Sequence, residues 1–187
     1  MTDAARPGHG ILRVMAREPG ALTLSEDDRR VVAVWAADCA ERVLALFEAR
    51  ARPRTDARPR DAIDGVRAFA RGELQIGPMR ALAAEAHAAA RAVEDPAAAA
   101  AARAAGHAAA VAHMASHALA ASAYAAMAAG HAAPNGPDAV ANELDWALAH
   151  ATPEVRAVMR RLPRRSARGG ALGAVVGDLD ARLTVLA

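Results

Sequence analysis

The feature that most constrains the fold is a long alanine-rich segment. Its centre, AAGHAAAVAHMASHALAASAYA over residues 104–125, is built mainly from alanine, with three histidines and one tyrosine. Alanine has the highest helix propensity because a helix costs its side chain no conformational entropy. Asp95 and Pro96 supply an N-cap and a first-turn proline, and Gly130 marks an end. The segment therefore predicts one long helix over residues 96–130 whose smooth surface allows close packing.

The rest of the chain also favours helices. Aromatic residues make up 3% of the 187 residues, strand-forming residues are sparse, and no segment alternates apolar and polar side chains convincingly. Caps, prolines and apolar residues at helical spacing predict six further helices. These cover about 23–50, 59–72, 77–93, a stretch after the 134–137 turn, 153–162 and 171–186.

These elements predict an all-α fold, a single-domain helical bundle of five to seven helices around the long alanine-rich central helix. The length of the chain is sufficient for one domain with a real core. The expected organisation is a flexible N-terminal arm over 1–22, the bundle over 23–162, and a linker with a short C-terminal helix over 163–187.

Charge and cysteine content exclude several classes of protein. The formal net charge is +2, which does not by itself indicate a nucleic-acid partner, and the arginine-rich stretch over 160–168 lacks aromatic residues for base stacking. The lone Cys39 excludes an internal disulfide framework and fits a reducing compartment. No signal peptide or membrane span is predicted. We therefore expect a cytoplasmic protein, and its abundant Ala, Arg, Gly and Pro are typical of a high-GC coding bias.

The histidines of the alanine-rich segment form a candidate site. His113 and His117 are one turn apart, and Tyr124 returns to nearly the same face of a continuous helix, with His107 nearby. The i, i+4 pair His113 and His117 has the spacing of two metal ligands. The sequence has no E-x-x-H or H-E-x-x-H motif, so no metal or cofactor is predicted. The favoured interpretation is that these side chains bridge helices.

A second interpretation is kept, in which the chain is a small-molecule-binding protein or an enzyme, with or without a metal. Buried imidazoles and a phenol can act as acid–base groups. The candidate catalytic residues are then His107, His113, His117, Tyr124 and Asp38.

Other polar residues are predicted to join helices. Asp38 and Arg42 border an apolar stripe that contains Trp35 and Cys39, and we expect Cys39 to be a buried small hydrophobe. Asp38 is expected to accept hydrogen bonds from a basic or imidazole partner, and His87 with Arg91 one turn later is expected to extend the histidine row. The candidate partners of Asp38 are Arg42, Arg58, Arg60 and His113.

Several ordered strings resemble a known family. WAADCAERVLALFE, RPRDAID, HAAAR, the alanine–histidine segment and ELDWALAHATPEVRAVM together are similar to the Imm-5-like immunity proteins of bacteria, over about residues 24–161. The resemblance implies a small all-helical protein from a polymorphic toxin locus that binds and neutralises a toxin. It implies no catalytic residues, and it leaves open whether the protein forms homo-oligomers. The positions that it carries over are Trp35, Asp38, Cys39, Arg58, Pro59, Arg60, His87, His107, His113, His117 and Tyr124. The candidate binding residues among them are Trp35, Asp38, Arg58, Arg60, His87, His113 and His117.

Overall fold

The computed structural model describes residues 24–164 and 169–185, and over these residues it contains eight helices and no strand. The predicted all-α class is confirmed. The predicted arm over 1–22 and residues 165–168 of the predicted linker lie outside the described residues. The helices are α1 (Glu26–Glu48), α2 (Arg58–Ala70), α3 (Ile76–Arg91), α4 (Pro96–Ala110), α5 (His117–Ala132), α6 (Gly136–Ala149), α7 (Pro153–Arg160) and α8 (Gly170–Val185).

The expected count of five to seven helices is wrong because the predicted helix over 96–130 is two helices, α4 and α5. After Ala110 the chain turns through tight i→i+3 bonds, such as that from the His113 N–H to the Ala110 carbonyl at 3.1 Å. Arg29 of α1 donates from Nε to the Ala112 carbonyl at 2.9 Å and satisfies an acceptor that the break releases.

Burial explains why α4 and α5 form a helical hairpin and not one continuous helix. A continuous helix over 96–130 would be about 50 Å long, whereas the 23-residue α1 is about 35 Å long. Folding back lets α4 and α5 pack against each other, and α4 also contacts α1, α2 and α3. Twelve of the fifteen residues of α4 are buried. Alanine supplies no preference for either arrangement, so tertiary packing decides.

Several helices begin at capping residues and first-turn prolines, the local signals that mark a helix start in a sequence. Ser25 and Asp28 form a capping box at α1, Asp95 accepts from the Ala98 N–H at α4, and Thr152 accepts from the Val155 N–H at α7. Prolines occupy the first turns of α2, α4, α6 and α7. These local signals correctly predicted where most helices begin.

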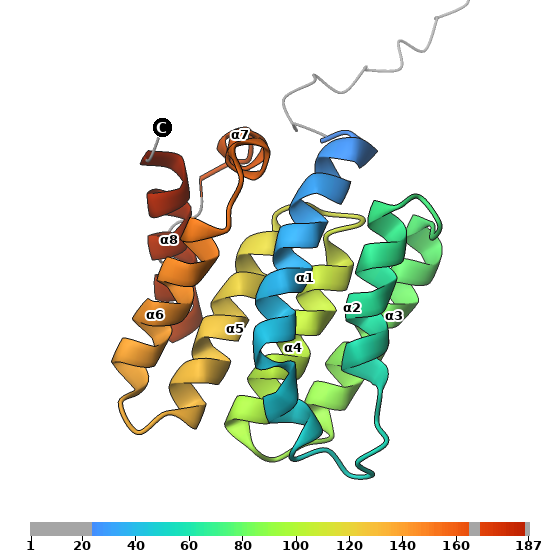
Figure 1. The fold of residues 1–187 in the computed structure, drawn as a ribbon, viewed down its shortest axis with the longest axis vertical. Helices are drawn as coiled ribbons and strands as arrows, with labels where there is room; N and C mark the ends of the chain where they lie inside the picture. The colour runs from blue at the N-terminus through green and yellow to red at the C-terminus, as the bar shows by residue number, and fades with distance from the viewer. Residues whose placement is uncertain (1–23, 165–168, 186–187) are drawn as a thin grey trace, which may run out of the picture.

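Figure 1 shows how the helices are arranged. α1 crosses in front of α4 and α5, with α2 and α3 on one side and α6 and α8 on the other. The core is mostly alanine, and the largest fully buried side chains include Phe47, Phe69, Leu44, Ile63 and Met79. α8 is joined to the bundle by contacts with α5 and by the ion pair of Arg182 with Asp145 on α6. None of the described helices is long and apolar enough to cross a lipid bilayer.

Candidate functional site

Four imidazoles and a phenol meet where α3, α4 and α5 lie side by side. His107 of α4 is central: its ring centroid lies 4.8 Å from that of His87 on α3 and 5.1 Å from that of His117 on α5. Tyr124 stacks on His107 at 5.2 Å, and His113 from the α4–α5 turn lies 5.5 Å from His117. We call these five residues the imidazole cluster. All five side chains are partly exposed.

The predicted row of histidines on a single helix face is therefore replaced by a cluster built from three helices and a turn. His113 and His117 are not on one continuous helix, because the chain reverses between them. The antiparallel hairpin places the start of α5 beside the second half of α4, which brings His107 and His117 together.

A hydrogen bond joins the two central histidines. The Nδ1 atoms of His107 and His117 are 3.0 Å apart, so one ring donates its proton and the other accepts it. The accepting ring must be neutral at Nδ1. In the described part of the chain, the Nδ1 atom of His113 is buried without a hydrogen-bond partner.

Gly106 makes room for His87. A Cβ atom at position 106 would lie 2.7 Å from both Cε1 and Nδ1 of the His87 ring. The absence of a side chain at Gly106 thus allows the close approach of an imidazole from α3.

Replacing Gly106 with alanine is expected to push the His87 ring out of contact with His107. Gly77 provides a matched control, because a Cβ atom there meets nothing within 4 Å, and Gly77→Ala should be neutral or stabilise by up to about 1 kcal/mol. Histidine side-chain NMR measures the effect: the His87 resonances should move in Gly106→Ala and stay in place in Gly77→Ala. Unchanged His87 resonances in Gly106→Ala would show that the contact is absent.

Burial lowers the pKa of three histidines of the cluster, His87, His107 and His113. It lowers the pKa of His107 to about 3, with smaller contributions from His87, His117 and Arg103. Burial also lowers the pKa of His87, helped by Arg91 and Arg103. Efficient general acid–base catalysis needs a pKa near the working pH, so a base with the pKa of His107 is poorly suited to it. His107, at the centre of the cluster, is better suited to hydrogen bonding as a neutral ring than to proton transfer.

These shifts predict a loss of stability in mild acid. Between pH 6.5 and 5 the unfolded chain binds a proton at His107 that the folded protein does not bind, so unfolding becomes easier as pH falls. His107 alone accounts for up to about 1.4 kcal/mol per pH unit below its ordinary pKa of 6.5. His113 shifts in the same direction, through burial and Arg80.

Urea denaturation at pH 7.5, 6.0 and 5.0 measures this effect. The midpoint should fall with pH in the wild type and fall less steeply in His107→Gln. Carboxylates with a lowered pKa, such as Glu41 and Asp56, stay ionised above pH 5 and do not contribute. A midpoint that is the same at pH 5.0 and pH 7.5 would refute the neutral cluster.

The metal-ligand spacing of His113 and His117 does not extend into a larger ligand set. Within residues 24–164 and 169–185, no group of three or more histidine, cysteine or acidic side chains could hold a metal ion. The rings of His113 and His117 meet edge to face, at an interplanar angle of 60°.

Asp38 has a different partner from those expected. It lies 3.3 Å from Nη2 of Arg67, which also pairs with Glu41, so the four candidate partners are wrong. α2 runs antiparallel to α1, which places the end of α2 beside the middle of α1 and its start beside Glu48. The expected partners bond elsewhere: Arg42 to Glu143, Arg58 to Asp56 and Arg60 to Glu48.

Trp35 and Cys39 lie inside the bundle. Trp35 is 3% exposed and donates from Nε1 to the Ala147 carbonyl at 2.9 Å. Cys39 is buried, as expected, and its Sγ accepts a hydrogen bond from Ser122 at 3.3 Å. Burial raises the pKa of the Cys39 thiol to about 12, so it is not a reactive thiolate. Both side chains are placed to support the fold.

An aromatic stack on α6 was missed from the sequence. The guanidinium of Arg42 lies 4.2 Å from the centroid of the Trp146 ring, and His150 stacks on that ring at 3.8 Å. The i, i+4 spacing of Trp146 and His150 was a usable signal. Arg42 comes from α1, and its arrival depends on the tertiary fold.

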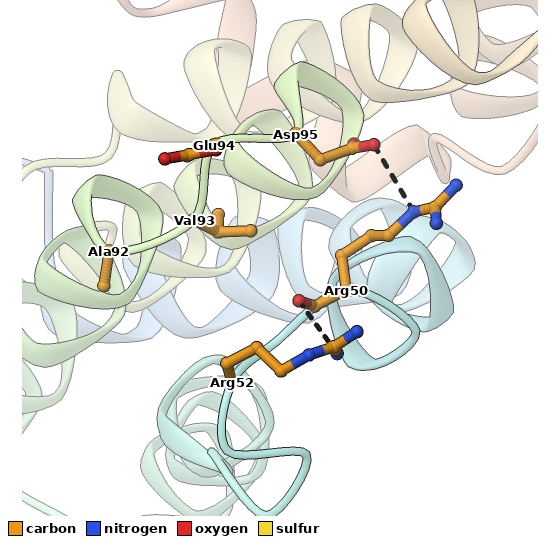
Figure 2. Close-up of a pocket in the computed structure, with 6 residues that line it drawn as sticks. All are labelled: Arg50, Arg52, Ala92, Val93, Glu94 and Asp95. Atoms are coloured by element: carbon orange, nitrogen blue, oxygen red, sulfur yellow. Dashed lines mark hydrogen bonds and ion pairs between the residues drawn. The ribbon is translucent and has the colours of Figure 1, made fainter.

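A pocket of about 560 Å³ lies between the α1–α2 loop and the α3–α4 loop. Figure 2 shows the residues that line it. Arg50 lies 3.4 Å from Asp95, which also caps α4, and Arg52 donates to the Ala51 and Arg50 carbonyls. Asp95 and backbone carbonyls thus hold the two arginines, so the pocket is best explained as a joint between two loops. The lining residues are Arg50, Arg52, Ala92, Val93, Glu94 and Asp95.

Comparison with known proteins gives a family. The model of the family described as Imm-5 like putative immunity protein matches residues 22–154. This range covers α1 to α6 and includes the whole imidazole cluster. The chain belongs to this family. No curated protein and no solved structure shows a significant match.

Proposed function

We propose that this chain is an immunity protein that binds a partner toxin and neutralises it without catalysis. The observation that carries the proposal is the family match over residues 22–154, which spans most of the bundle. The neutral imidazole cluster supports a binding role, because its central ring is too weakly basic for proton transfer near neutral pH. The proposed compartment is the bacterial cytoplasm, where the single thiol of Cys39 stays reduced.

Co-expression in a bacterial host tests this function. We expect a toxin domain to be encoded by the gene adjacent to this one; that domain, expressed from an inducible promoter, is the probe, and a gene neighbourhood without a toxin would contradict the proposal. Growth should stop when the toxin is induced alone and continue when the full chain is expressed with it. A toxin domain of unrelated sequence serves as the specificity control and should still arrest growth. Arrest by the adjacent toxin despite abundant folded protein would contradict the proposal.

A further inference from the structure

The arginines around the imidazole cluster differ from most others in the protein. Within the described residues most arginines pair with carboxylates or donate to backbone carbonyls, as Arg67 and Arg156 do. Among the described residues Arg80, Arg91 and Arg103 make no ion pair; Arg54 and Arg160 make none either, but they lie on other segments. Arg103 instead lies over the ring of Tyr124, at 5.9 Å from its centroid.

The three arginines share one face with the cluster. Arg80, His87 and Arg91 are separated by seven and four residues on α3, which places them on one side of that helix. Arg103 and His107 are one turn apart on α4. The antiparallel helices bring Arg80 near His113 at one end, while Arg91 and Arg103 are near His87 farther along. We call this surface of α3, α4 and α5 the cationic face.

Acidic residues do not neutralise the cationic face. α4 and α5 contain no aspartate or glutamate, and α3 contains only Glu85. The Glu85 carboxylate lies 3.9 Å from Arg58 of α2. The α1–α2 surface differs, because Asp38 and Glu41 there share Arg67. The three helices thus carry three arginines and one glutamate, so positive charge predominates on them, and Glu94 follows Arg91 in the α3–α4 loop.

The other side chains of the cationic face suit a protein interface. Arginine and tyrosine are enriched among the residues that dominate binding energy, and Tyr124 is partly exposed beside Arg103. Met114, next to His113, is 51% exposed and offers an apolar contact at the end of the face. Neutral imidazoles between the arginines can donate and accept hydrogen bonds without adding charge.

We propose that the cationic face is the docking surface for the toxin and that its arginines bind aspartate and glutamate side chains of that partner. This inference rests on the proposed function and names the surface and the chemistry of the partner. Guanidinium groups bind carboxylates through paired, charge-assisted hydrogen bonds. Opposite charges on the two surfaces would also speed the encounter.

Charge reversal tests the cationic face. The toxin domain encoded by the adjacent gene, purified in inactive form, is titrated calorimetrically with the full chain and with Arg91→Glu/Arg103→Glu. The matched control is Arg54→Glu/Arg160→Glu, which makes the same charge change at exposed arginines elsewhere. We expect affinity to fall at least about tenfold in the first variant and less than about threefold in the control. Wild-type binding should also weaken as salt increases.

A second double variant, which neutralises the two charges and does not reverse them, controls for misfolding. Arg91→Gln/Arg103→Gln removes both charges without reversing them and should also lose affinity, while circular dichroism confirms a folded bundle. Wild-type binding that persists unchanged in both folded variants overturns the cationic face and leaves the proposed function standing. No binding by the wild type overturns the proposed function, and the cationic face with it. A single-stranded RNA probe that binds the wild type and not Arg91→Glu/Arg103→Glu would assign the face to nucleic acid and overturn the proposal.

Discussion

Replacing Trp35 with alanine is expected to lower the free energy of unfolding by about 3–5 kcal/mol, the largest effect of any single substitution considered. The side chain is 3% exposed, and the other buried aromatic side chains among the described residues are Phe47 and Phe69. Its indole N–H also donates to the Ala147 carbonyl at the end of α6. That carbonyl belongs to the last turn of the helix, where acceptors have no partner within the helix.

Chemical denaturation of Trp35→Ala and Val34→Ala measures the effect against a neighbour. Val34 is 39% exposed on the same helix, so its substitution should change stability by less than about 0.5 kcal/mol. Trp35→Phe keeps an aromatic ring but loses the hydrogen bond. Its free energy of unfolding should lie between those of Trp35→Ala and Val34→Ala. Equal stability of Trp35→Ala and Val34→Ala would show that the indole is not in the core.

Leucine in place of Ala105 is expected to destabilise the protein by about 1–3 kcal/mol through overpacking. Ala105 is fully buried in α4, a helix that contacts α1, α2, α3 and α5. Helices that meet through alanine lie too close together for a longer side chain to enter. The added methyl groups must therefore displace a neighbouring helix.

The same substitution at an exposed position isolates the packing effect. Ala84 lies on the solvent side of α3, and Ala84→Leu makes the same change in helix propensity without entering the core. Thermal unfolding should show a lower Tm for Ala105→Leu and little change for Ala84→Leu. If Ala105→Leu melts at the wild-type temperature, α4 is peripheral and the alanine core is wrongly placed.

Local chemistry made much of the fold predictable. Ser25, Asp95 and Thr152 cap the helices that the sequence predicted, because a cap depends on residues within one turn. The break between α4 and α5 was not predictable in this way. Its released acceptor, the Ala112 carbonyl, is satisfied by Arg29, 83 residues earlier in the chain.

The candidate site was likewise predictable from the sequence only in part. The residue types of the imidazole cluster stood out, because helix formation does not require histidine in an alanine segment. Their geometry did not follow, since the α4–α5 hairpin and α3 assemble the cluster. The Arg67 partner of Asp38 was missed for a related reason: the antiparallel register of α1 and α2 selects it, and spacing along one helix carries no such information.

The uncompensated arginines connect the fold to the proposed function. Alanine allows α4 to lie between its neighbours, and only Arg103 and His107 of its fifteen residues, besides Pro96, are not buried. The helix thus contributes its few polar side chains to a single face. Packing that is ordinary for an alanine-rich bundle also determines which charges a partner can reach.

Inhibition of the purified toxin is the most direct measurement of the proposed function. The toxin domain encoded by the adjacent gene is assayed for its own activity while the full chain is added in increasing molar ratio. Neutralisation by binding predicts that activity falls in proportion and disappears at a fixed stoichiometric ratio, with no loss of either protein. Full toxin activity in a large molar excess of the folded chain would contradict it.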